Sequence, residues 1–178
     1  MTAPRLGYED SIRRLQDLGY LGSDEQPPIP DHLPQPEDEE PLGLNFFRTF
    51  VGDDADLSNL TIPRTFFGRS EINNVSLRNA DLTESNLRWN DFIDVDFTDA
   101  TLARADLRAS IFTRVNFTRT DLRAADMRRG NYEECIFDGA LMDNAILVRR
   151  QELQISLTNA QKAVIDWRED DGPEPSGG

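Results

Sequence analysis

Arginine, joined once by tryptophan, recurs at intervals of about twenty residues through the middle of the sequence. Guanidinium groups bind carboxylates and phosphates through paired hydrogen bonds, and exposed arginine and tryptophan are enriched at binding hot spots. A regular series of this kind indicates a surface that binds an acidic partner. The candidate partner-binding residues are Arg69, Arg88, Trp89, Arg108, Arg128, Arg129 and Arg149.

The sequence offers few residues for catalysis or metal binding. Its one histidine, His32, lies in a proline-rich stretch, and its one cysteine, Cys135, lies at a small position that we expect to face inward. A thiol buried among apolar groups stays protonated and is a poor nucleophile. The aspartates recur at an outward-facing position and so diverge, whereas a metal ion needs converging oxygen ligands. We therefore expect a protein that is not an enzyme and needs no cofactor.

The acidic charge is concentrated at the two ends of the chain. The 178 residues include 33 acids and 19 bases, a net charge of −14. Residues 1–42 hold ten acids and three bases, residues 43–150 seventeen and fourteen, and residues 151–178 six and two. This excess of acids argues against direct binding of nucleic acid. Because the sequence has no long apolar run and no basic, apolar leader, we expect a cytoplasmic protein without a membrane span.

Every fifth residue from Leu57 to Leu147 is large and apolar, through nineteen consecutive positions. The residue two places before each of these centres is almost always small, and aspartate or asparagine often lies between the two. An α-helix would spread a five-residue period around its surface, whereas residues two apart in a short extended segment point the same way. Each repeat is therefore expected to direct one large and one small side chain inward and then to turn a corner.

A second period of twenty residues gives the number of sides. Phe97, Phe117 and Phe137 are twenty residues apart, so four repeats complete one coil and like residues stack in successive coils. Nineteen repeats on four sides make about 4–5 coils.

The repeat is clearest in three segments, Ala80–Glu84, Ala105–Ala109 and Ala125–Arg129. Each has a small residue, an aspartate, a leucine or methionine, and two corner residues. This pattern resembles that of the pentapeptide-repeat family, over about 100 of the 178 residues. The expected fold class is all-β, namely a quadrilateral β-helix, or solenoid, of about 4–5 coils, with a short helical N-terminal element and a C-terminal capping helix. The resemblance implies that this β-helix is right-handed.

Five segments are expected along the chain. They are a short amphipathic helix in residues 1–23, an acidic, proline-rich linker without regular structure in 24–41, the β-helix in 42–151, the capping helix in 152–168 and a disordered tail in 169–178.

Both ends of an open coil need a cover, because they expose unpaired backbone groups and apolar side chains. At the N-terminal end, residues 42–51 are expected to form a lead-in strand. At the C-terminal end, residues 158–167 are expected to be helical, with Thr158 and Gln161 at capping-box spacing. The residues expected to lie over the last coil are Ala163, Val164 and Trp167.

The last coil also carries apolar residues at outward positions that are polar elsewhere, namely Ile136, Leu141, Ile146 and Val148. Two structures could cover these side chains. One is the capping helix of the same chain. The other is a second subunit, which would give a homodimer through the C-terminal coil and helix.

The arginine and tryptophan residues all fall on the side of the solenoid that is centred on Leu87 and Leu107. One interpretation is an interaction face for an acidic partner. The other is that corner positions tolerate arginine, with Asp106 and Asp126 neutralising part of the charge. A related hypothesis is that the acidic residues 36–40 fold back over this side and shield it.

Two functions follow from these patterns. The first is a non-enzymatic protein–protein interaction module, in which a rigid solenoid docks an unknown protein partner. The second is implied by the resemblance, because some family members are similar to B-form DNA in width and charge, bind DNA gyrase or topoisomerase IV, and protect against quinolones or toxins. This sequence departs from such a DNA mimic, because residues 43–150 carry seventeen acids against fourteen bases and include an arginine side.

Overall fold

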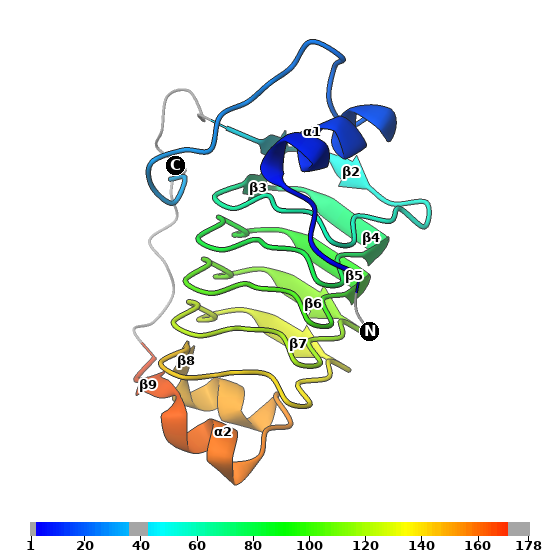
Figure 1. Ribbon diagram of the computed structural model, residues 1–178. Helices are drawn as coiled ribbons and strands as arrows, with labels where there is room; N and C mark the ends of the chain where they lie inside the picture. Colours follow the sequence, from blue (N-terminus) through cyan, green and yellow to red (C-terminus); the bar gives the residue numbers. More distant parts are fainter. Residues whose placement is uncertain (1–2, 36–42, 171–178) are drawn as a thin grey trace.

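The computed structural model describes residues 3–35 and 43–170, which form a solenoid of stacked β-strands with a helical cover at each end (Figure 1). Its elements are α1 (Tyr8–Asp17), β1 (Asn45–Phe47), β2 (Phe50–Val51), β3 (Phe66–Gly68), β4 (Glu71–Ser76), β5 (Asp91–Asp96), β6 (Ile111–Thr113), β7 (Asn131–Glu133), β8 (Ile146–Val148), η1 (Arg149–Leu153), α2 (Asn159–Val164) and β9 (Asp166–Arg168). None of the described helices is long and apolar enough to cross a membrane.

The strands are parallel and stack one coil above the next. β2, β4, β5, β6 and β7 form one five-stranded sheet, in which Phe92 pairs with Phe112 and Phe112 with Tyr132. β1 pairs with β3 and β8 with β9, and single bridges join the remaining repeats. One side can be followed from Asn45 through successive pairs to Asp166, which gives about six turns. The solenoid fold is confirmed, but the expected 4–5 coils were too few.

The additional coil at the N-terminal end is formed by the segment that we expected to be a lead-in strand. β1 and β2 build a coil of their own, with Phe46 and Val51 buried in its centre. β2 pairs with β4 at a separation of 21 residues, whereas β5 pairs with β6 at a separation of 20. The extra residue lies in the turn around Asp53 and Asp54, which have left-handed φ angles of 59° and 58°. This insertion shifts the five-residue period, so the period is continuous only from Leu57 onward.

The inward positions are filled by stacked side chains, as the two periods predict. The rings of Phe92 and Phe112 are 5.0 Å apart and nearly parallel, and those of Phe112 and Tyr132 are 4.8 Å apart. A second stack consists of Phe97, Phe117 and Phe137. Asn90 lies at a position that is small in most repeats, and it is only 1% exposed. The core is therefore continuous along the solenoid.

The second residue after each centre turns the corner in the left-handed region of backbone space. Arg69, Trp89 and Arg129 have φ angles of 52°, 55° and 60° at this position. This conformation costs an L residue roughly 1–2 kcal/mol, and the ladder of hydrogen bonds on both sides of the corner must offset that cost. Because the corner recurs in register, side chains at this position form columns along the edges of the solenoid.

The N-terminal helix covers the first coil. α1 buries Ile12 and Leu15, which lie three residues apart on its apolar face, against the solenoid core. The Ser11 hydroxyl accepts a hydrogen bond of 2.8 Å from the backbone N–H of Thr61. α1 is thus the cover that the unpaired upper end of the coil requires.

The linker segment has no helix or strand over residues 24–35, but it packs against the solenoid. Pro30 and Pro34 are buried, and the Tyr8 hydroxyl donates to the Pro27 carbonyl at 2.7 Å. The lack of regular structure thus agrees with the expectation for residues 24–35, but their packing against the solenoid was not predicted. Residues 36–41 of that segment, and most of the expected tail, lie outside the described residues.

The C-terminal helix is shorter than expected over residues 158–167. α2 ends at Val164, because Ile165 is extended with φ −77° and ψ 139° and leads into β9. Ala163 and Val164 are exposed and do not cover the last coil. Trp167 does lie over it, as part of β9, where it pairs with β8.

The apolar side chains of the last coil are covered only in part. Ile155 and Ile165 are buried in the core cluster, and Val148 has no exposed surface. The intramolecular cover therefore exists. Ile136 and Leu141, however, remain 46% and 47% exposed.

Candidate binding surface

The structure places six of the seven predicted binding residues in two parallel columns, which together with Arg149 we call the arginine side. The first column follows the buried centres directly and contains Arg88, Arg108 and Arg128. The second column lies at the left-handed corner and contains Arg69, Trp89 and Arg129. Arg149 lies at the start of η1, below both columns.

The first column is an alternating ladder of arginines and aspartates. Arg108 donates to Asp106 through Nε at 2.9 Å and Nη2 at 2.6 Å. Arg128 forms the same two bonds with Asp126, at 2.9 and 2.7 Å. Weaker contacts join the rungs, because Nε of Arg108 lies 3.5 Å from Asp126 and Nε of Arg88 lies 3.9 Å from Asp106. The two aspartates therefore link three coils.

This ladder is partly buried and internally neutralised. The side chains of Arg108 and Arg128 are each 27% exposed, that of Arg88 is 13% exposed, and that of Asp106 is 8% exposed. Hydrogen bonding to Asp106 raises the pKa of Arg108 further above its ordinary value. These contacts support a structural role for the column in holding coils together. A role in binding stays a prediction.

Trp89 stands out in the second column. Its side chain is 39% exposed, and the guanidinium of Arg88 lies over its ring at 4.2 Å from the centroid. The stack fixes the indole while leaving part of its surface open to solvent. Arg69, one coil above, is also exposed. Arg149 stacks on Trp167 instead, at 5.4 Å.

The proline-rich segment packs against the solenoid beside the upper part of the arginine side. The Asn86 side-chain amide donates to the Pro34 carbonyl at 2.7 Å, and Nη1 of Arg64 donates to the Pro30 carbonyl at the same distance. Asn86 is fully buried by this contact. These contacts were not predictable from the sequence, since both acceptors are backbone atoms of a proline-rich segment. The suggested shield of residues 36–40 lies outside the described residues.

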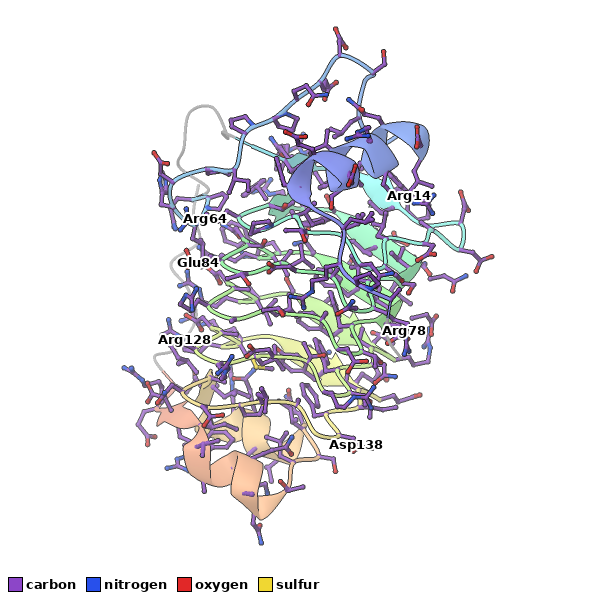
Figure 2. The ribbon with its side chains drawn as sticks, viewed as in Figure 1. Arg14, Arg64, Arg78, Glu84, Arg128 and Asp138 are labelled. Atoms are coloured by element: carbon purple, nitrogen blue, oxygen red, sulfur yellow. The ribbon has the colours of Figure 1, made fainter. Side chains whose placement is uncertain are left out.

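Arginine–carboxylate columns also occur on other edges of the solenoid. Glu84 accepts hydrogen bonds from Arg104 below it and from Arg64 above it, and Figure 2 shows Arg64 and Glu84 one above the other along one edge. Arg119 pairs with Asp99 through bonds of 2.7 and 2.9 Å. Each pair is twenty residues apart in sequence, or one coil. These columns were not predicted, although opposite charges offset by twenty residues are visible in the sequence.

The described residues contain no cluster of histidine, cysteine and carboxylate side chains that could hold a metal ion. Cys135 is partly buried, its thiol donates weakly to the Phe112 carbonyl, and burial raises its pKa to about 11. Such a thiol is almost wholly protonated at neutral pH and is a poor nucleophile. His32 lies in the packed part of the linker segment and is exposed.

Comparison with known proteins bears on the fold. The sequence matches the family model for pentapeptide repeats, in eight copies, over residues 53–88 and 91–129. A solved pentapeptide-repeat protein from the thylakoid lumen of Arabidopsis thaliana is similar with a TM-score of 0.52 and 22% identity, over 64% of this chain and 72% of that one. No curated protein matches the sequence significantly.

Two further solved structures are more distant. HetL, a pentapeptide-repeat protein from the cyanobacterium Nostoc that is involved in regulating heterocyst differentiation, gives a TM-score of 0.49 at 18% identity, over 58% of this chain. The match spans only 46% of HetL. A plasmid-mediated fluoroquinolone resistance protein gives a TM-score of 0.28 at 14% identity, over 70% of this chain and 80% of that one. At these identities the similarity concerns the fold alone.

Proposed function

Because this chain belongs to the pentapeptide-repeat family, we propose that it is a non-enzymatic scaffold that binds a protein partner along the arginine side. Trp89 carries this proposal. An indole that is 39% exposed at a fixed corner, with Arg88 stacked on it, combines the two residue types most enriched at binding hot spots. Arg69 extends the same corner upward.

The partner that suits this corner presents carboxylates beside an apolar or aromatic side chain. The guanidinium groups of Arg108 and Arg128 are already paired with aspartates, so they set the field and geometry of the surface and bind the partner only weakly. Arg69 and Trp89 project from the corner and form the contact itself. A rigid solenoid holds them at a fixed separation of one coil, about 4.8 Å, which lowers the entropy lost on binding.

The test is affinity capture with two variants of the full chain. Arg69→Glu combined with Trp89→Ala removes the proposed contact and leaves the pairs of Arg108 and Arg128 with aspartate in place, and a specific partner should be recovered at least about tenfold less well. Arg78→Glu is the matched control, because Arg78 is 49% exposed and lies on another side. Capture that is equal for wild type and the double variant would reject the arginine side. An equal loss of the partner with Arg78→Glu would show that binding is not specific to the arginine side.

Binding to a type II topoisomerase as a DNA mimic is the second candidate. The length of the solenoid favours this candidate. About six turns at roughly 4.8 Å each make a rod of about 29 Å, which is longer than the nineteen repeats suggest. Its charge is less suitable, since a DNA mimic presents acids along most of its surface. A supercoiling assay with the purified protein decides between the two. Inhibition or protection at micromolar concentration would support this candidate, and no effect would exclude it.

A further inference from the structure

The last coil of the solenoid is closed at three of its four corners. Three backbone carbonyls of the last coil, which would accept hydrogen bonds from a following coil, accept them instead from groups of the C-terminal segment. The pairs are Gln151 Nε2 with Gly130 O, Gln161 Nε2 with Ala140 O, and Asp166 N with Ala145 O, at 3.0, 3.1 and 2.8 Å. The chain therefore closes these corners with two side-chain amides and one strand.

The fourth corner, where β7 ends, has no such substitute. One coil above, the Arg114 N–H donates to Glu133 O at 2.8 Å and Val115 O accepts from Ile136 N at 3.1 Å. The equivalent groups of the last coil, Glu134 N–H and Cys135 C=O, have no partner within residues 3–35 and 43–170. β7 itself is the terminal strand of its sheet and pairs only with β6.

The chain turns away from this edge. A further rung of the sheet would lie one coil after β7, at residues 151–153, but these residues form the end of η1. Leu153 is 94% exposed and thus does not pack under the sheet. In Figure 1, α2 and β9 lie on the β8 side of the last coil.

The side chains around the edge are acidic and aliphatic. Glu133 and Glu134 are exposed at the end of β7, and Ile136 follows at 46% exposure. Leu153 adds a second exposed aliphatic side chain from η1. A segment that pairs with β7 would therefore meet two carboxylates and two apolar surfaces.

We propose that the lower edge of β7 binds an extended segment of a partner protein by strand addition, and that this segment carries basic and aliphatic residues. An unpaired edge of a sheet offers backbone donors and acceptors in a fixed geometry, and an added strand satisfies them. The carboxylates of Glu133 and Glu134 select a positively charged segment, while Ile136 and Leu153 bind its apolar side chains. This surface is distinct from the arginine side and has the opposite charge preference, so the two proposals stand or fall separately.

Hydrogen exchange tests whether the edge is open. In the full-length protein, the amides of Tyr132 and Glu134 should exchange at least about tenfold faster than those of Phe112 and Arg114, which occupy the same positions in the paired strand above. Equal protection of the two pairs in dilute protein would overturn the proposal. Protection that appears only at high protein concentration would assign the edge to a second copy of the chain, and would also overturn it.

Binding is tested with an acetylated and amidated hexapeptide of sequence Lys-Val-Thr-Val-Lys-Val. It should slow exchange of the Tyr132 and Glu134 amides at least about tenfold at saturation, and the same peptide N-methylated at alternate residues should not, because methylation removes the donors that pair with the edge. Failure of the unmodified peptide to protect these amides, or equal protection by the methylated one, would overturn the proposal.

A pair of charge-reversal variants tests whether Glu133 and Glu134 select a positively charged segment. Glu133→Lys combined with Glu134→Lys should weaken peptide binding at least about tenfold. Glu71→Lys combined with Asp91→Lys makes the same change in charge on exposed residues higher in the same sheet, and it should leave the affinity within about twofold of wild type. Equal weakening by both variants would reduce the effect to net charge and would contradict a specific edge.

Discussion

The inside of one corner is held by polar side chains that bond from coil to coil. Asn90 Oδ1 accepts from the Ser70 N–H at 2.9 Å, and the Ser110 hydroxyl accepts from the Asn90 N–H at 3.0 Å. The Asn90 amide also donates to the Phe67 and Arg88 carbonyls, at 2.9 and 3.0 Å. This corner thus has a polar inward residue in three successive coils and glycine in the last, whereas alanine or valine is frequent at the other corners.

Replacing Asn90 by leucine should destabilise the protein strongly. The substitution keeps the volume but removes one acceptor and two donor bonds at a site that is 1% exposed, leaving the Ser70 N–H and two carbonyls without partners. Buried polar groups left unsatisfied cost about 1–3 kcal/mol each, so we expect a loss of at least about 3 kcal/mol in the free energy of unfolding. Urea denaturation monitored by circular dichroism measures it.

Asn90→Ser is the matched control. Serine occupies the equivalent position one coil above and one coil below, as Ser70 and Ser110, and there it accepts and donates the corresponding bonds. It should cost no more than about 1 kcal/mol. A leucine variant as stable as wild type would show that the polar ladder contributes nothing.

At the scale of the elements, the repeat itself was predictable and its ends were not. A period of five residues combined with one of twenty admits only stacked extended segments, so the core residues from Leu57 to Leu147 follow from the sequence. The one-residue insertion near Asp53 hid the first coil, because it breaks the period without interrupting the stack.

The C-terminal cover shows a second reason why the ends of the solenoid could not be predicted from the sequence. Thr158 and Gln161 do form the expected capping box. The amide of Gln161 also donates to the Phe137 and Ala140 carbonyls, at 2.8 and 3.1 Å. That second contact depends on where the chain returns in space, and local sequence does not encode it. The binding surface is similar in this respect, because arginines at twenty-residue spacing predict a column but not the proline-rich segment that packs beside it.

Gln151 should be the most important single residue of the C-terminal cover. Its side-chain Nε2 donates to the Met127 and Gly130 carbonyls at 2.9 and 3.0 Å, and its side-chain Oε1 accepts from the Val148 N–H. The residue is 1% exposed. Gln151→Ala should therefore lower the free energy of unfolding by about 2–3 kcal/mol.

The control for this prediction is Gln154→Ala, which removes an exposed amide three residues further on and should change stability by less than about 0.5 kcal/mol. Hydrogen exchange of the Val148 amide gives an independent readout, because it should accelerate in Gln151→Ala alone. Equal stability of the two variants would mean that the last coil does not need its cap.

For the whole molecule, charge pairs along the edges act as ties between coils. The solenoid block has seventeen acids and fourteen bases, so it carries little net repulsion in spite of the total charge of −14. Hydrogen bonds from Arg104 lower the pKa of Glu84, and those from Arg119 lower the pKa of Asp99. A carboxylate with a lower pKa in the folded chain stabilises the fold above its unfolded pKa, and the contribution is lost as the pH falls through the folded value.

Stability should therefore decrease in acid, beginning below about pH 5, where the unfolded carboxylates start to bind protons. We expect the Tm to fall by about 10 °C or more between pH 7 and pH 3, measured by differential scanning calorimetry at constant ionic strength. Relief of repulsion between the acidic ends acts in the opposite direction. It should be the smaller effect, because those charges lie mainly outside the solenoid block and are screened by salt.

The variant Glu84→Gln separates the two effects, because it keeps a hydrogen-bond acceptor between Arg64 and Arg104 but cannot titrate. Its Tm should be below that of wild type at pH 7, and the gap should narrow as the pH falls towards 3, since the wild-type carboxylate loses its stabilising contribution as it takes up a proton. Asp138→Asn is the control, because Asp138 is exposed and, unlike Glu84, has no arginine side chain hydrogen-bonded to its carboxyl group among the described residues, so the variant should follow the wild-type curve at every pH. A Tm gap between Glu84→Gln and wild type that stays constant from pH 7 to pH 3 would show that the coils are held together by packing and backbone bonds alone.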